Sequence, residues 1–267
     1  SPMVKNEYNL SKKIKKKLYF QKLESKNTFT SIKSLILPEE TQTLQTALAK
    51  ISDIDKKKKK FITLLLPLIV KENQKILANR SRIQQIQNFL NFNKTLSNKD
   101  RRFVMELASK YHIDIIHKHK IDIIEELIER VDIIPNSIVI AQAANESGWG
   151  LSRFAKEFNA FFGEYTFNIE KGVVPSYREE GKKHLIKFFP TVNDSIQSYF
   201  RNINNHSAYS DFRKTRKLFR SNNLQMNIEL LVNTLGVYAE DQNYIKNLKS
   251  IIRDNKLYDF DNITNIS

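Results

Sequence analysis

The chain has 267 residues, 40% of them hydrophobic and 27% charged, which is an ordinary composition for a globular protein able to bury a sizeable core. Six glycines and six prolines argue against a loop-rich β architecture, and the absence of cysteine excludes disulfides and thiolate chemistry. The net charge of +15 favours an anionic partner or, more simply, a lysine-rich solvated surface.

The positive charge is concentrated in the first half of the chain. Residues 1–120 contain 26 lysines and arginines against 10 aspartates and glutamates, whereas residues 121–267 contain 18 against 19. We interpret residues 1–34 as a loosely ordered, lysine-rich arm. Residues 35–120 are then a basic helical region that packs on the domain after it. Nucleic acid, lipid headgroups and anionic wall polymer all suit such a surface, but no aromatic residues interleave Lys56–Lys60, so nucleic acid is the least favoured.

Hydrophobic residues recur at helical spacing through the first half and into the second. A polar break at Asn91–Asp100 separates two groups of helices. The segments are Leu44–Ile51, Phe61–Val70, Ile76–Leu90, Phe103–Tyr111 and Ile121–Ile134. None contains 18 uncharged apolar residues, so no transmembrane helix is predicted.

The second half is predicted to be a mainly α domain, over residues 121–267, with a β-lobe at about 163–190. A buried helix over Asn136–Glu146 ends in Ser147–Gly150, where two glycines allow left-handed turns, and Ser152 can cap the next helix. The lobe contains three short β-prone runs, and helices return after it. The runs are Tyr165–Ile169, Val173–Tyr177 and His184–Phe189, and the helices are Ser195–Asn204, Glu229–Leu235 and Asn243–Arg253.

The segment Ala141–Gly150 (AQAANESGWG) has the features of a catalytic acid site. Its alanines make a slim, closely packed helix that places Glu146 at the C-terminus beside Trp149. Apolar burial, the aromatic wall and the negative end of the helix dipole would each raise the pKa of this carboxyl. A general acid needs a raised pKa to keep its proton near neutral pH. By itself, however, one glutamate is more often a surface residue at a frayed helix end.

The motifs around this segment resemble the glycoside hydrolase family 73 β-N-acetylglucosaminidases, which include the catalytic domain of the flagellar rod-associated muramidase-like proteins. The resemblance covers Ala141–Ala155 (AQAANESGWGLSRFA) followed by Asn159–Gly163. The tail Tyr238–Tyr244 (YAEDQNY) is similar to the family's Tyr-Ala-x-Asp-x-x-Tyr signature. With one group of its members, the resemblance extends from Leu37 through Phe61–Asn79 to the chain end.

The resemblance implies a lysozyme-like helical fold and an endo-β-N-acetylglucosaminidase that hydrolyses β-1,4 bonds of peptidoglycan. Glu146 matches the family's acid, and no cofactor or metal is expected. The substrate places the protein in the cell envelope or periplasm. Ser1-Pro2-Met3 is typical of a cloning remnant, so we expect that a signal segment has been removed before it.

Four further residues are substrate-binding candidates. The resemblance implies that Tyr238 lines the sugar cleft, while Asp241 and Tyr244 complete its signature. Asp241 could instead cap a helix and Tyr244 could pack in the core. Trp149 could stack on a sugar or form a wall of the acid, although a structural role comes first for a tryptophan on a glycine-flanked turn.

The second catalytic carboxylate is open. Glu179 and Glu180 are candidates from the β-lobe, with solvated turn residues as the simpler interpretation. Alternatively, the acetamido group of the substrate acts as nucleophile.

Two other functions remain as alternatives. A lytic transglycosylase also uses a single glutamate followed by Ser-x-Gly. A non-catalytic wall- or polyanion-binding protein would use the basic first half on a decayed catalytic fold. His112, His117 and His119 do not share one helix face, so we interpret them as solvated or satisfied histidines rather than metal ligands.

Overall fold

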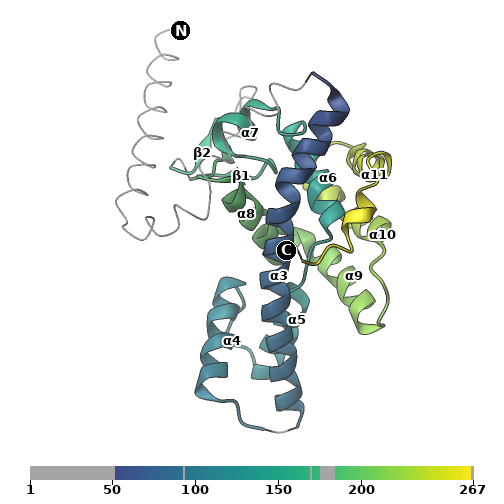
Figure 1. Ribbon diagram of the computed structural model, residues 1–267. Helices are drawn as coiled ribbons and strands as arrows, with labels where there is room; N and C mark the ends of the chain where they lie inside the picture. Colours follow the sequence, from purple (N-terminus) through teal and green to yellow (C-terminus); the bar gives the residue numbers. More distant parts are fainter. Residues whose placement is uncertain (1–51, 93, 169, 175–183, 266–267) are drawn as a thin grey trace.

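The protein is mainly α-helical, with one small antiparallel sheet, as the sequence predicts (Figure 1). The computed structural model describes residues 52–265 except residues 93, 169 and 175–183; the predicted arm at residues 1–34 lies outside this part. The α-helices of the described part are α3 (Ile54–Asn91), α4 (Asn98–Lys110), α5 (Lys120–Arg130), α6 (Asn136–Ser147), α7 (Arg153–Phe158), α8 (Val192–Asn205), α9 (Ser210–Ser221), α10 (Ile228–Asn233) and α11 (Tyr244–Asp254). Three 3-10 helices accompany them: η1 (Ser207–Tyr209), η2 (Thr234–Tyr238) and η3 (Leu257–Phe260).

Helix α3 is a single element of 38 residues, where the sequence suggested separate helical stretches. Asp53 begins it by accepting the backbone N–H of Asp55 at 2.8 Å. Pro67 lies inside the helix and lacks the N–H that would donate to the carbonyl four residues earlier. Because Pro67 is exposed, this unpaired carbonyl is on the solvent side of the helix and is not buried. Helix α3 packs against α5, α6 and α8, and its distal half projects beside α4 (Figure 1). The first half of the chain is therefore attached to the second through α3, while the exact division into domains stays a prediction.

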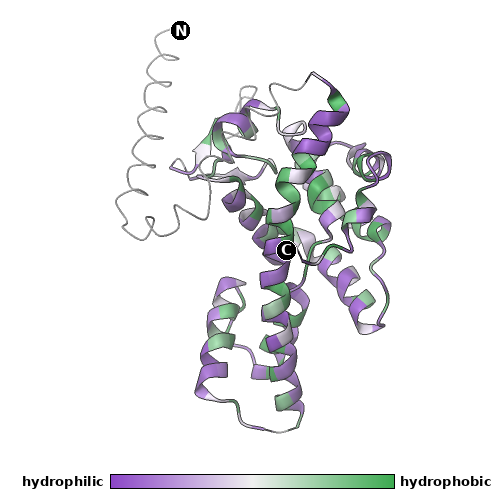
Figure 2. Ribbon diagram, viewed as in Figure 1, coloured by the Kyte–Doolittle hydropathy of each residue, from purple (hydrophilic) through white to green (hydrophobic). Residues whose placement is uncertain are grey.

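Helix α6 occupies the centre of the molecule. Ten of its twelve residues are buried, and it packs against α3, α11 and η3. Its run of alanines lets these neighbours approach closely, and Figure 2 shows hydrophobic residues gathered on α6 and the adjoining part of α3. Gly148 ends the helix in the left-handed conformation at φ 57°, as the glycine pattern predicts. Glu146 thus lies in the last turn of a buried, rigid helix.

The β-lobe is a three-stranded antiparallel sheet in the order β1-β3-β2. Its strands are β1 (Tyr165–Thr166), β2 (Gly172–Val173) and β3 (Leu185–Lys187). Tyr165 pairs with Ile186, and the N–H of Lys187 donates to the carbonyl of Glu164 at 2.7 Å. This last bond extends the ladder to the residue before β1 and fixes the backbone of Glu164.

A second feature of the fold is a group of buried charges, here called the arginine cluster, formed by Asp132 with Arg80, Arg216 and Arg220. Asp132 is 2% exposed and follows α5. Arg220 of α9 donates two hydrogen bonds to its carboxylate, at 2.8 and 2.9 Å, in the bidentate geometry that favours such pairs. Arg80 of α3 and Arg216 of α9 lie 3.6 and 3.9 Å from it. The cluster joins α3 and α9 to the segment between α5 and α6.

Candidate active site

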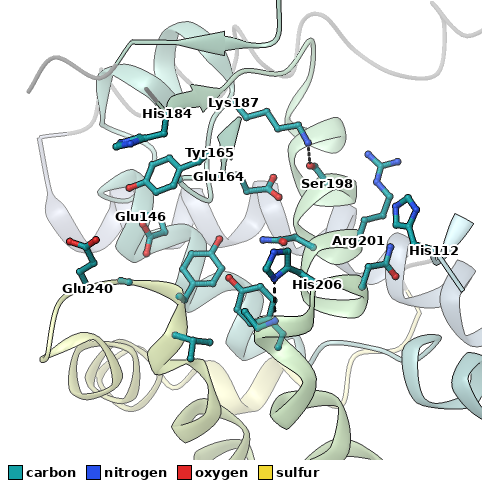
Figure 3. Close-up of a pocket in the computed structure, with 18 residues that line it drawn as sticks. His112, Glu146, Glu164, Tyr165, His184, Lys187, Ser198, Arg201, His206 and Glu240 are labelled. Atoms are coloured by element: carbon teal, nitrogen blue, oxygen red, sulfur yellow. Dashed lines mark hydrogen bonds between the residues drawn. The ribbon is translucent and has the colours of Figure 1, made fainter. Parts of the chain in front are cut away.

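One cleft of about 1070 Å³ brings together side chains from α6, the β-lobe, α8 and η2 (Figure 3). Glu146 contributes from the last turn of α6, Glu164 from the residue before β1, and Tyr238 from the end of η2. The cleft is large enough for a chain of sugars to lie along it. Its polar lining includes three glutamates, Glu146, Glu164 and Glu240, which suits acid–base chemistry.

Glu146 is partly buried, and burial raises the pKa of its carboxyl above the ordinary value. A hydrogen bond from Tyr244 and one from Asn145, at 3.4 Å to Oε1, act in the opposite direction without cancelling the effect. Among the described residues, no charged side chain contributes to the change in the pKa of Glu146. The carboxyl therefore has the environment of a proton donor, as the sequence predicts, and burial is the main cause.

A chain of buried hydrogen bonds orients Glu146 from behind. Gln142 lies one turn earlier on α6 and is fully buried. Its Oε1 accepts the hydroxyl of Tyr199, and its Nε2 donates to the hydroxyl oxygen of Tyr244 at 2.8 Å. Because the Tyr244 oxygen accepts from Gln142, its own proton is directed to Glu146. The amide thus fixes the direction of the Tyr244 hydroxyl.

Gly163 lets the β-lobe approach Glu146. Its φ is 62°, in the left-handed region that favours glycine, and a Cβ placed on it would lie 2.9 Å from Oε2 of Glu146. A side chain at this position would collide with the carboxyl. The glycine of the Asn159–Gly163 motif is therefore needed beside the Glu146 carboxyl.

Glu164 is the second carboxyl in the cleft, and the sequence analysis missed it. Burial raises the pKa of its carboxyl, while the charges of Lys187 and Arg201 and a hydrogen bond from Ser198 oppose the increase. Lys187 Nζ donates to Ser198 Oγ at 2.6 Å, and burial lowers the pKa of this lysine. One oxygen of Glu164, Oε2, is buried without a partner in the described part of the chain. The signal in the sequence that could have identified Glu164 is its position immediately after Gly163, the last residue of the motif.

The predicted signature residues divide into two groups. Tyr238 lines the cleft and donates its hydroxyl proton to the carbonyl of Phe162 at 2.6 Å. Its ring stacks on that of Tyr244, with centroids 5.8 Å apart. Asp241 is exposed and is not among the lining residues; its carboxylate accepts the N–H of Asn243 at 2.8 Å, beside the start of α11. Tyr244 thus contacts the acid, whereas Asp241 holds the turn.

Trp149 is not brought to the cleft lining. Its ring packs edge-on against Phe61 of α3, at a centroid distance of 5.6 Å, and the ammonium group of Lys58 lies 5.3 Å from its ring centre. The aromatic groups near Glu146 are tyrosines instead. Trp149 therefore fastens α3 to the turn that follows α6.

Two aromatic rings of the β-lobe line the cleft without having been singled out from the sequence. Tyr165 is 66% exposed, and its ring lies 4.5 Å from that of His184.

Glu179 and Glu180, the candidates proposed for the second carboxylate, lie outside the described residues. Among the described residues, no group of three His, Cys, Asp or Glu side chains is arranged to hold a metal ion.

The family model described as mannosyl-glycoprotein endo-beta-N-acetylglucosaminidase matches residues 121–257. The chain is 30% identical over 201 residues to Protein bax of Escherichia coli (strain K12), which covers 75% of this chain and 70% of that protein. A solved structure, the catalytic domain of the autolysin Auto from Listeria monocytogenes, matches at 18% identity with a TM-score of 0.41, covering 85% of this chain and 99% of that one.

Proposed function

The chain belongs to the glucosaminidase family of glycoside hydrolases, and from this we propose that it is an endo-β-N-acetylglucosaminidase that hydrolyses β-1,4 bonds in peptidoglycan. The observation that carries the proposal is Glu146, a carboxyl with a raised pKa that lines a cleft of about 1070 Å³ and is oriented by Tyr244. Glu146 is the general acid, and its buried hydrogen-bond network keeps it in place.

In the proposed reaction, Glu146 gives its proton to the glycosidic oxygen as the bond to the anomeric carbon breaks. The sugar passes through a state with oxocarbenium character, and water completes the cut by adding its hydroxyl to that carbon. The hydroxyl of Tyr244, which hydrogen bonds to Glu146, favours the carboxylate left after proton transfer.

We assign the second carboxylate to Glu164. Burial raises the pKa of both carboxyls. The charges of Lys187 and Arg201 oppose this rise at Glu164, whereas among the described residues no cation does so at Glu146, and this difference favours Glu164 as the carboxyl that acts in its ionised form. Ionised Glu164 would accept a proton from the attacking water or stabilise the positive sugar. Glu179 and Glu180 remain alternatives, as does attack by the substrate's own acetamido group.

Aromatic side chains supply the surfaces for the sugars. Tyr165 offers an exposed ring at one wall, and Tyr238 lies at another with its hydroxyl engaged by Phe162. Flat aromatic faces contact the apolar faces of sugar rings at little cost in side-chain entropy. We propose both as substrate-binding residues.

The substrate gives the protein its place in the cell envelope. The basic first half would favour contact with anionic surfaces there, in agreement with the exposed lysines at the start of α3. Among the described residues, no helix has the length and apolar character needed to cross a bilayer.

The test is Glu146→Gln, assayed by release of reducing sugars from purified cell wall. Loss of a positioned general acid is expected to lower the rate by about 10²–10⁴-fold. Glu106→Gln, on the exposed face of α4, is the matched control and should retain full activity. Undiminished activity of Glu146→Gln would remove this residue from the mechanism.

Product analysis separates this proposal from the alternatives. Mass spectrometry should find N-acetylglucosamine at the new reducing ends. Anhydro-muropeptide ends would instead identify a lytic transglycosylase. Binding to wall that decreases steeply with salt, without cleavage of any preparation, would identify a non-catalytic polyanion-binding protein.

A further inference from the structure

The cleft carries opposite charges at its two ends. Figure 3 shows Glu146 and Glu240 toward one end, Arg201 and His112 toward the other, and Glu164 between them. The proposed cut takes place at the acidic end and the centre. Apart from the effect of the Arg201 charge on Glu164, the proposed chemistry gives the cationic end no role.

Helix α8 forms the wall of the cationic end with a polar stripe. Arg201 and Asn202 follow Ser198 by three and four residues, and Asn205 follows these two by four and three, so the four residues share one helix face, and all of them line the cleft. Arg201, Asn202 and Asn205 carry hydrogen-bond donors that lie beyond Glu146 and Glu164 along the cleft. The stripe therefore continues the cleft past the bond to be cut.

Arg201 is the strongest donor in this stripe. Its side chain is exposed, and within the described ranges its guanidinium has no hydrogen bond or ion pair. Lys187, by contrast, is engaged by Ser198 at 2.6 Å. The Arg201 charge nevertheless acts on the carboxyl of Glu164, which places it close to the catalytic centre. It is thus free to bind an anionic group of a substrate held there.

Two histidines lie at the same end of the cleft as Arg201. Nδ1 of His206 accepts the N–H of Ala208 at 3.1 Å, so its hydrogen is left on Nε2 and available as a donor. His112 lies in the turn after α4, which Arg130 attaches to α8 by donating to the carbonyls of Tyr111 and Asn205 at 2.9 and 3.3 Å. The turn therefore holds His112 beside the α8 stripe.

A guanidinium with neighbouring imidazoles is a site for a carboxylate. The acetamido sugars of peptidoglycan are themselves uncharged; the negative charge lies in the peptide stem attached to the lactyl group of every second sugar. We propose that the cationic end of the cleft binds a carboxylate of the peptide stem on the muramoyl sugar next to the cleaved bond. The enzyme then prefers strands that carry peptides. This inference rests on the proposed function and adds its substrate specificity.

The experiment compares two substrates: intact peptidoglycan, and the same peptidoglycan after its stem carboxylates have been converted to neutral amides. Arg201→Gln should lower kcat/KM on the intact substrate by about tenfold or more beyond any loss on the neutral substrate, as expected for loss of a charge-assisted hydrogen bond; a smaller loss common to both substrates is expected from the effect of the Arg201 charge on Glu164. Arg102→Gln, which removes an equal charge from the exposed face of α4, should leave both values unchanged. Arg201→Lys should recover only part of the loss, because lysine lacks the bidentate fork.

The outcomes distinguish this inference from the function on which it rests. Collapse of the preference for the substrate with charged stems over the neutral one in Arg201→Gln supports the carboxylate site. Equal losses on both substrates with an altered pH profile would mean that Arg201 acts only through Glu164, and unchanged values would mean that it has no role; either result overturns the inference while leaving the hydrolase intact. A wild-type protein that cleaves neither substrate would overturn the proposed function itself, and the inference with it.

Discussion

Two carboxyl groups that are shielded from solvent have opposite surroundings: Asp132 in the arginine cluster and Glu146 in the cleft. Asp132 is surrounded by Arg80, Arg216 and Arg220, and their charges and hydrogen bonds lower the pKa of its carboxyl despite burial. Glu146 is less deeply buried, but among the described residues no cation opposes the effect of burial, so its pKa is raised. Burial opposes ionisation in both cases, and the partners decide the sign.

This difference separates a structural acid from a reactive one. Ionised Asp132 joins three elements and has no access to the cleft; its charge stabilises the native state. Burial raises the pKa of Glu146 at the cleft wall, so ionising this carboxyl opposes folding. The free energy lost by burying a functional carboxyl is offset by stabilising interactions elsewhere in the fold. The interactions of the arginine cluster are among them.

The two groups have opposite effects on stability as pH changes. Because the folded pKa of Asp132 is lowered, its contribution is present above the unfolded value of about 3.9 and is lost as pH falls through the folded value. Because the folded pKa of Glu146 is raised, the stability associated with its neutral form is present at low pH and is lost as pH rises through the folded value.

The largest expected effect comes from Asp132→Asn. Removing the only acid of the arginine cluster leaves three guanidinium groups together, one of them, Arg216, fully buried with its pKa already lowered to about 10. We expect a loss of about 3–5 kcal/mol in the free energy of unfolding, measured with denaturant. Glu146→Gln is the matched control and should leave stability unchanged or increased. Equal destabilisation by the two variants would contradict the distinction between them.

A smaller effect is expected from Gln142→Leu, which removes the amide behind the catalytic acid. Two buried tyrosine hydroxyls lose a partner, so stability should fall by about 1–3 kcal/mol. Without this amide, the Tyr244 hydroxyl no longer hydrogen bonds Glu146 in a fixed direction, and the rate should fall by about tenfold. The hydrogen bond from Tyr244 lowers the pKa of Glu146, so its loss raises that pKa further, and the high-pH limb of the kcat profile should move to higher pH. A destabilised variant with an unchanged pH profile would reduce Gln142 to a packing role.

Much of the fold could be predicted from the sequence because local signals agreed there. Helix α6, the left-handed Gly148 and the Ser152 cap are encoded within a few residues. The capping bond is observed: the N–H of Ala155 donates to Oγ of Ser152 at 3.1 Å. Helix α9 was missed because its buried face includes Arg213 and Arg216 rather than a hydrophobic stripe.

The site was only partly predictable for a related reason. Glu146 lies in a recognisable motif, whereas the environment of Glu164 depends on Lys187 and Ser198, which are distant in sequence and meet it only through the ladder of β3 and the face of α8. Trp149 adjoins the acid in sequence, but the turn directs its ring to Phe61. Neighbours along a chain are predictable; neighbours across a cleft require the fold.

The most direct test of the account is a titration of Glu146 itself. Carbon NMR of protein labelled at the glutamate side-chain carboxyls, with Glu146→Gln to identify the missing signal, would follow its ionisation with pH. We predict that this signal titrates at a clearly higher pH than those of the exposed glutamates. A signal that titrates with the exposed glutamates, or below them, would contradict the claim that burial keeps the catalytic proton in place.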